Sequence, residues 1–305
     1  MADKNNDILQ NETRFTAKDA GLAYTLAVIF YVAFSLIFPL FSEKAEAAFG
    51  NDFVFYLRFF IAPVSIATAI LFFKLRFKPN AISLLKPKKA GNSAIIGAIL
   101  IFLGVMLGFS DVNAFFISLF EKAGYEYEVI TLPDGATFKN VTLCIVFLCL
   151  FPTVAEEILM RGIISEGLRE TGVIFALAAG GVTFSLFHLS PQQTVYQFIV
   201  GASFTLIAIR GGNWCLTAAG HFLNNLIVVI SEYFFKDFVF PVYIKIPLVT
   251  VGLLSFFAGA FIYLKKVKKD EFKGEPLKIK DFAAFAAAGV IICAVLWVSQ
   301  LATGL

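Results

Sequence analysis

The sequence predicts an all-α integral membrane protein, a polytopic bundle of about eight or nine transmembrane helices. Hydrophobic residues make up 59% of the chain, charged residues make up 15%, and the mean hydropathy is +0.81. A soluble domain contains about 45–50% apolar and about 25% charged residues. The apolar residues also occur in runs of about 20, the length of a helix that crosses a bilayer. Helices are favoured over strands because a helix satisfies its own backbone hydrogen bonds in lipid, whereas an open sheet does not.

Nine apolar runs bounded by polar or charged residues are the candidate spans. The fifth and sixth are expected to form a tight hairpin around Ser190-Pro191, and the sixth is short. The count becomes eight if the last segment lies at the periphery of the bundle. The candidate spans are 20–42, 53–75, 93–120, 141–168, 172–190, 194–209, 213–235, 246–264 and 282–303.

Small residues inside these spans are expected to serve packing. Glycines four apart or adjacent let two helices approach closely, and such pairs occur in the third span (Gly104 and Gly108) and the fifth (Gly180 and Gly181). The four cysteines form no CxxC pair and are expected to be small buried hydrophobic residues: Cys144, Cys149, Cys215 and Cys293.

Two segments rich in lysine and arginine, 74–89 and 265–280, set the orientation, because positively charged loops stay on the cytoplasmic side. Six predicted spans separate them, an even number, so both fall on one side; segment 121–140, on the other side, is acidic on balance. We expect a cytoplasmic tail at 1–19 and a single membrane domain at 20–305, in the cytoplasmic membrane of a bacterium. The net charge of +3 is too small to suggest a nucleic-acid partner; membrane lipids are the expected surroundings.

The chain has only two histidines, His188 and His221, and both fall inside predicted spans downstream of the adjacent acids Glu156 and Glu157. Ionisable groups are costly at membrane depth, so they mark a candidate functional site. Glu157 and Arg161 are four residues apart, on one helical face and within reach of an ion pair. Glu156 is turned by about 100° from Glu157, which leaves it free to activate a water molecule as a general base. The alternative is a purely structural ion pair.

Three further residues complete this pattern. Pro152 lies four residues before Glu156 and removes a backbone hydrogen bond, so we expect a kink that makes room for water. His221 and Asn225 are four residues apart and can both donate hydrogen bonds from one face, as an oxyanion hole requires; interhelical hydrogen bonding is the alternative. His188, taken alone, is typical of a hydrogen-bonded core residue.

The predicted depths of these groups in the bilayer overlap. Counted from the ends of their spans at about 1.5 Å per residue, Glu156 lies roughly 18 Å deep, His221 roughly 12 Å, Asn225 roughly 18 Å and His188 roughly 24 Å. We therefore expect the groups to converge on one cavity, in a catalytic core at about 141–235.

The order of these residues resembles three motifs of the CPBP family, which includes type 2 CAAX prenyl proteases, bacteriocin-processing enzymes and Abi-type membrane proteins. The motifs are Glu156-Glu157-xxx-Arg161, Phe184-xxx-His188 and His221-xxx-Asn225; they lie within about residues 141–230, and no motif position departs from the pattern. The resemblance implies a glutamate-dependent intramembrane endopeptidase acting on a peptide or lipidated protein, without identifying the substrate. It implies that Glu156 activates the water, Glu157 and Arg161 support it, His188 assists the water or the proton transfer, and His221 and Asn225 stabilise the oxyanion.

Two other functions stay open. One is a non-catalytic membrane protein, such as a bacteriocin-immunity or scaffold protein. The other is a proton-coupled transporter, because carboxylates and imidazoles also relay protons, although the sequence shows no inverted repeat. For the endopeptidase, we expect catalysis without a metal or other cofactor. The alternative is zinc held by Glu156, His188 and His221, since two histidines and a glutamate bind catalytic zinc elsewhere.

Overall fold

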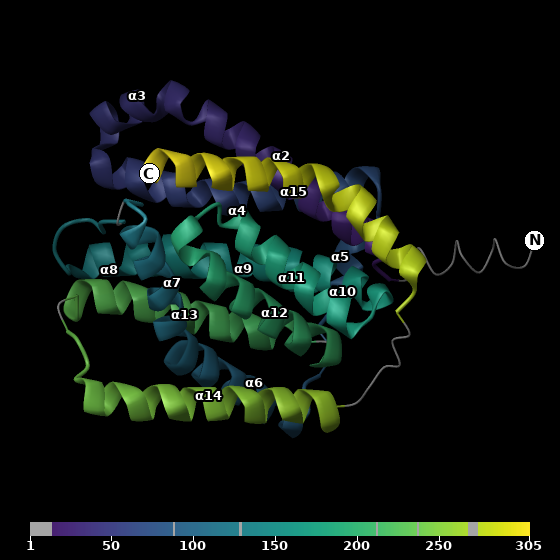
Figure 1. Ribbon diagram of the computed structural model, residues 1–305. Coiled ribbons are helices and arrows are strands. Elements are labelled where there is room, and N and C mark those ends of the chain that lie inside the picture. Colours follow the sequence, from purple (N-terminus) through teal and green to yellow (C-terminus); the bar gives the residue numbers. More distant parts are fainter. Residues whose placement is uncertain (1–13, 88, 128–129, 212, 237, 268–273) are drawn as a thin grey trace, which may run out of the picture.

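The fold is an α-helical bundle (Figure 1), given by a computed structural model that describes residues 14–87, 89–127, 130–211, 213–236, 238–267 and 274–305. All regular structure in these ranges is helical. Eight helical segments are long and apolar enough to cross a membrane, which confirms the predicted class. They are α2 (Ala17–Ile37), α4 (Asn51–Arg76), α6–η1–α7 (Asn92–Lys122), α8 to η4 (Phe138–Thr171), η5–α12 (Pro191–Gly211), α13 (Trp214–Phe234), α14 (Val242–Lys265) and α15 (Pro276–Gly304).

Three details of the predicted spans are wrong. The first span ends at Ile37, because the chain turns before Pro39 and continues as a separate helix, α3 (Pro39–Phe49). The fifth segment, α11 (Val173–Phe187), has 15 residues and is too short to count as a span, so the count is eight although the last segment, α15, is itself a span and packs along α2. The sixth is not short: α12 (Thr194–Gly211) has 18 residues, preceded by the 3₁₀ turn η5 (Pro191–Gln193).

The third and fourth segments contain π-helical turns. In the third, α6 (Asn92–Gly104) passes through η1 (Val105–Phe109) into α7 (Ser110–Lys122). In the fourth, π-helical stretches lie on both sides of the short helix that carries the two acids, and such turns are common at functional sites. The order there is α8 (Phe138–Cys144), η2 (Ile145–Leu150), α9 (Phe151–Glu157), η3 (Ile158–Ile164), α10 (Ser165–Leu168) and η4 (Arg169–Thr171).

Glycines allow the closest helix contacts, as predicted. A Cβ atom on Gly180 of α11 would lie 2.1 Å from the Thr205 hydroxyl on α12, so only hydrogen fits there. This close approach accompanies the predicted hairpin of α11 and α12. A Cβ atom on Gly104 would lie 2.5 Å from Phe256 of α14. The absence of a side chain at this position therefore allows α6 to pack closely against α14.

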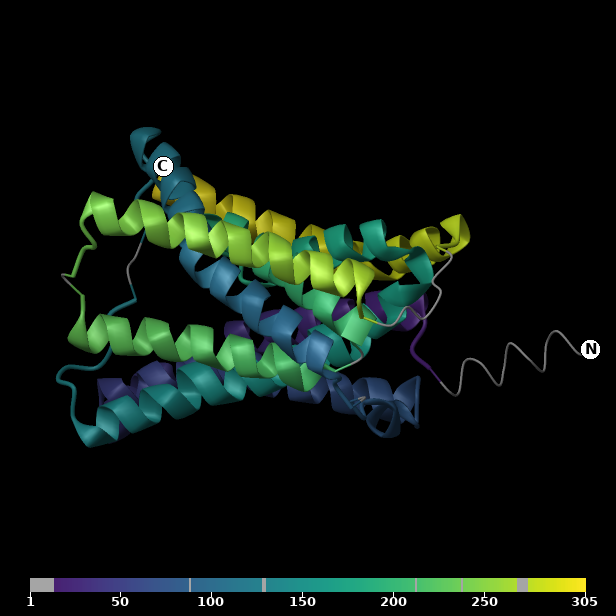
Figure 2. The same ribbon diagram turned by 90° about the horizontal axis from the view of Figure 1, so that it is seen from below.

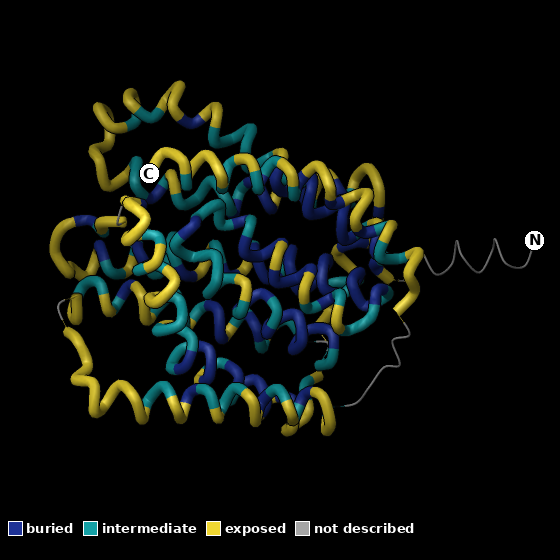
Figure 3. Tube along the Cα trace, viewed as in Figure 1, coloured by how far each residue is buried: buried dark blue, intermediate teal, exposed yellow. Residues whose placement is uncertain are grey.

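The helices surround a buried centre formed by α9, α11 and α12 (Figure 3). The segment containing α12 is half buried, at 50%, whereas the α14 span is 17% buried and forms the periphery. Figure 2 shows α6 crossing obliquely between α13 and α14, both of which it contacts. Glu156, Glu157 and His188 therefore lie on protected helices, whereas His221 and Asn225 lie on α13, whose span is 22% buried.

Ion pairs bring the predicted cytoplasmic segments together at one end of the bundle. Asp19 in the first turn of α2 binds Lys78, which follows α4, and Lys18 lies 3.8 Å from Asp281 at the start of α15. The short helix α5 (Ala81–Leu84) lies at this end too (Figure 1). The described parts of the two basic segments therefore lie at the same end of the bundle, with five of the long apolar segments and the shorter helix α11 between them. Residues 1–13 of the predicted tail and residues 268–273 lie outside the described residues.

We predict that this end faces the cytoplasm. In a Cys215→Ser background, single cysteines at Lys89 and Lys280 should be protected from an impermeant thiol reagent added to intact cells. A cysteine at Lys139, an exposed residue at the opposite end, should react. Labelling at Lys89 or Lys280 together with protection at Lys139 would reverse the orientation.

The cysteine prediction holds for three of the four residues. Cys144, Cys149 and Cys293 are buried, but Cys215 is exposed. Cys215 is exposed because it lies in the first turn of α13, two residues after the capping residue Asn213, at the end of the bundle.

Candidate functional site

Glu157 lies at the end of α9 and joins two helices. Its Oε1 atom lies 3.1 Å from Arg161 Nη1 and 2.9 Å from Nδ1 of His221 on α13, and both the carboxylate and the guanidinium are inaccessible to solvent. The ion pair predicted from the four-residue spacing is therefore present. The hydrogen bond to His221 was not predicted, and it fixes the rotation of α13 relative to α9.

Glu156 has a different environment. It is only 7% exposed, yet its Oε2 atom makes no hydrogen bond to the described part of the chain. The nearest basic atom is Nε2 of His221, at 4.0 Å. A buried polar atom is almost always hydrogen-bonded, so this oxygen is available to a small molecule or a substrate. Oε2 of Glu157 also makes no hydrogen bond to the described residues, and the two acids differ in that only Glu157 has a close ion-pair partner, through Oε1.

Two aromatic rings hold the Arg161 guanidinium. Its central carbon lies 4.3 Å from the ring centroid of Phe184 on α11 and 5.1 Å from that of Phe204 on α12. Its nitrogens make no well-aligned hydrogen bond to the described residues, so the contact with Glu157 is an ion pair without hydrogen-bond geometry. A desolvated cation gains about 2 kcal/mol from an aromatic face. The rings therefore help Glu157 to offset the cost of burying this charge.

His188 ends α11 beside the same rings. Its Nδ1 atom lies 2.9 Å from the Phe184 carbonyl oxygen, and its ring packs 4.8 Å from the Phe184 ring. The imidazole interacts electrostatically with Glu156 but makes no hydrogen bond to another predicted site residue among the described residues. The next residue, Leu189, has a φ of 53°. This left-handed conformation costs roughly 1–2 kcal/mol for a side chain of this kind, and such strain is frequent next to functional groups.

Asn225 lies one turn after His221 on α13, as the spacing predicts. Its Nδ2 atom donates to the Leu148 carbonyl oxygen in the π-helical stretch η2, at 3.2 Å. A carboxamide has two N–H groups, and the second makes no hydrogen bond to the described residues. Pro152, expected to disturb the helix, lies in the first turn of α9, directly after that stretch.

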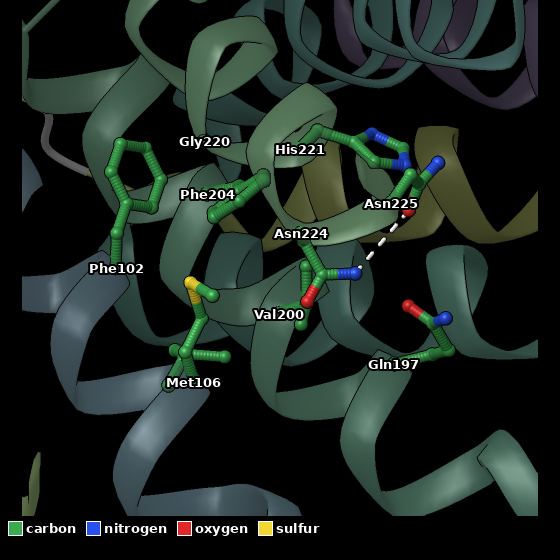
Figure 4. Close-up of a pocket in the computed structure, with 10 residues that line it drawn as sticks. Phe102, Met106, Gln197, Val200, Phe204, Gly220, His221, Asn224 and Asn225 are labelled. Atoms are coloured by element: carbon green, nitrogen blue, oxygen red, sulfur yellow. Dashed lines mark hydrogen bonds between the residues drawn. The ribbon is translucent and has the colours of Figure 1, made fainter. Parts of the chain in front are cut away.

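His221 and Asn225 line one cavity between α6–η1, α12 and α13 (Figure 4). One wall is apolar and includes Phe102, Met106 and Phe204. The remaining wall is polar and carries the carboxamides of Gln197, Asn224 and Asn225. The cavity therefore offers hydrogen bonds to an uncharged polar group and contact surface to an apolar one.

Of the predicted residues, the structure brings Glu156, Glu157, Arg161 and His221 into contact, whereas Asn225 and His188 lie beside them. Two important residues were not predicted. No motif or spacing in the sequence distinguishes Phe204 from the other phenylalanines. Asn224 is adjacent to Asn225 in the sequence, but its side chain binds a different partner, Tyr196. Phe184 was accessible to prediction, because it lies four residues before His188 and so on the same helical face.

The zinc alternative depends on the remaining ring nitrogens. Nδ1 of both His188 and His221 already contacts an oxygen atom, so Nε2 is the nitrogen of each ring that remains to bind a metal. Within the described ranges, no group of three His, Cys, Asp or Glu side chains is arranged to hold a metal ion. Catalysis without a metal therefore stays a proposal, tested below.

Comparison with known proteins supports the predicted resemblance. Residues 138–227 match the family model described as type II CAAX prenyl endopeptidase Rce1-like. This part of the chain is therefore similar to the Rce1-like group of the CPBP family. The matched Rce1-like region runs from α8 into α13 and contains all six predicted site residues. No curated protein and no solved structure matches the chain significantly.

Proposed function

We propose that this Rce1-like protein is an intramembrane endopeptidase that cleaves a peptide bond in a membrane-associated or lipidated substrate, using a water molecule activated by Glu156. One observation carries the proposal. Within an Rce1-like helix core, Oε2 of both buried carboxylates has no hydrogen-bond partner among the described residues, but only Glu157 is engaged through its other oxygen by Arg161 and His221, whereas the nearest basic atom to Glu156 is 4.0 Å away. A buried, unpaired carboxylate beside an imidazole is suited to general-base catalysis.

In the proposed reaction, Glu156 takes a proton from water while the water oxygen attacks the carbonyl carbon of the scissile bond. The electron pair of the C=O bond moves to oxygen and forms the oxyanion. When this intermediate collapses, the C–N bond breaks and the proton held by Glu156 passes to the leaving nitrogen. The products are a carboxylate and an amine. His188, whose ring packs against Phe184, holds the water or assists the proton transfer.

The oxyanion is proposed to receive hydrogen bonds from Asn225 and His221. The free N–H of Asn225 serves directly. His221 already donates from Nδ1 to Glu157, so Nε2 donates only when the ring carries both protons. The carboxylate oxygens of Glu157 and Glu156 lie 2.9 Å from Nδ1 and 4.0 Å from Nε2 of this ring. Donors fixed in a water-poor site stabilise a developing oxyanion strongly.

The test is peptide cleavage by the purified protein in detergent. Internally quenched peptides that end in a CAAX sequence, each with and without an isoprenyl chain, are assayed with and without a chelator, and bound metal is measured. We expect a defined cleavage fragment whose formation is insensitive to the chelator. Stoichiometric zinc with chelator-sensitive turnover would refute metal-free catalysis. No fragment from any peptide would favour the scaffold function, and proton-coupled uptake without a fragment would favour the transporter.

We predict that Asn225→Ala lowers kcat by roughly 10²–10³ and leaves KM nearly unchanged, because an oxyanion donor acts mainly in the transition state. The measurement is steady-state cleavage of the best peptide found above. A rise in KM alone would assign Asn225 to substrate binding instead. If zinc carried the reaction, the effect would be smaller than that of His221→Ala.

A further inference from the structure

The carboxamide of Asn225 is oriented by two residues outside the family motifs. Tyr196 on α12 donates its hydroxyl hydrogen to Oδ1 of Asn224 on α13, at 2.7 Å. Asn224 then donates from Nδ2 to Oδ1 of Asn225, at 3.3 Å, the hydrogen bond drawn in Figure 4. Asn225 in turn donates from Nδ2 to the Leu148 carbonyl oxygen. Three hydrogen bonds thus run in one direction across the cavity.

The direction of this chain is fixed at its Leu148 end. An amide side chain has an acceptor end and a donor end, whereas a phenol hydroxyl can donate or accept. The Tyr196 hydroxyl donates to Oδ1 of Asn224, and the Asn224 nitrogen faces Asn225. At the other end a carbonyl oxygen only accepts, which turns the Asn225 nitrogen toward Leu148. Rotating either amide by half a turn would place two oxygens, or two N–H groups, against each other.

Tyr196 itself is firmly held. Its backbone N–H donates to Oδ1 of Asn113 on α7, at 3.2 Å, and Nδ2 of Asn113 donates to the Gln192 carbonyl oxygen in η5, directly before α12, at 3.1 Å. Tyr196 therefore belongs to a hydrogen-bonded junction of α7 with η5 and α12.

We propose that Tyr196 and Asn224 are positioning residues for the reaction: they hold the Asn225 amide so that its free N–H points at the oxyanion. This inference rests on the proposed function of the site. A donor contributes most when its orientation is set before the reaction, because no reorganisation is then needed in the transition state. Removing the hydroxyl frees Asn224 to rotate, and Asn225 loses one of its two restraints.

The kinetic test is a double-mutant cycle. Tyr196→Phe, which keeps the ring, should lower kcat by roughly 3- to 10-fold, the size expected for one neutral hydrogen bond, with KM unchanged. In an Asn225→Ala background the same substitution should have no further effect on kcat, because there is no longer an amide to orient. The matched control is Tyr233→Phe. That hydroxyl, on α13, donates to the Pro133 carbonyl oxygen away from the cavity, and its loss should leave kcat unchanged.

A second measurement does not need turnover. In protein labelled with [¹⁵N]asparagine, the side-chain NH₂ signal of Asn225 is identified by its loss in Asn225→Ala. Tyr196→Phe should shift or broaden this signal, and Tyr233→Phe should not. An unaltered signal in Tyr196→Phe, or an equal loss of kcat in both backgrounds of the cycle, would overturn the positioning role. Absence of turnover in the wild type, together with the expected NMR shift, would instead refute the proposed function and leave the hydrogen-bond chain established.

Discussion

Glu156→Gln should lower the rate of peptide cleavage by roughly 10²–10⁴, the contribution of a well-placed general base, while leaving the amount of folded protein unchanged. Glutamine keeps the size of the side chain and its ability to accept a hydrogen bond, but it does not take a proton from water. Stability should be preserved because the Oε2 atom of Glu156 makes no hydrogen bond in the described structure. The measurements are kcat on the best peptide substrate and the thermal unfolding midpoint in detergent.

The control variant for this experiment is Glu46→Gln. Glu46 is an exposed residue of α3, so its substitution carries the same change of charge without reaching the site. It should leave both kcat and the unfolding midpoint at wild-type values. Equal activity of Glu156→Gln and the wild type would refute the proposed mechanism, which assigns the base to Glu156 and the ion pair with Arg161 and His221 to Glu157.

Hydropathy predicted the fold well because each span must satisfy its backbone within the membrane. The prediction failed where the apolar run contained a change of direction. Pro39 lies inside the run Ser35-Leu-Ile-Phe-Pro-Leu-Phe41, so nothing in the hydropathy separates α2 from α3. The π-helical turns around the acids likewise depend on how neighbouring helices pack, which a linear pattern does not contain.

The site was predictable to the extent that it depends on spacing within one helix. The four-residue separation gave the contact between Glu157 and Arg161, and the angle between adjacent residues gave the distinct environment of Glu156. Contacts between helices were harder to predict, because they depend on the rotation of one helix relative to another. The hydrogen bond from His221 to Glu157 is of this kind. Phe204 is one of 37 phenylalanines in the chain, and only the folded structure shows that it covers Arg161.

Glu157→Gln should destabilise the protein by about 3–5 kcal/mol, the usual cost of removing one partner from a buried ion pair. The reason is that Arg161 then keeps its charge in an environment with almost no exposure to solvent. The two aromatic faces remain, but at about 2 kcal/mol for a desolvated contact they replace only part of the lost interaction. The measurement is the unfolding midpoint in detergent, with folded yield as a second readout.

The double variant Glu157→Gln with Arg161→Met distinguishes an uncompensated charge from a loss of shape. Methionine fills the space between Phe184 and Phe204 with a flexible apolar chain that packs well against aromatic rings. If the stranded charge causes the loss, removing it should restore stability, so the double variant should unfold at a higher temperature than Glu157→Gln alone. Replacement of a whole buried ion pair by apolar groups is often neutral or stabilising. Additive losses from the two substitutions would show instead that packing around each side chain, and not their mutual attraction, accounts for the lost stability. Cleavage should stay low in the double variant even where stability returns, because glutamine no longer offers His221 the carboxylate that holds its ring.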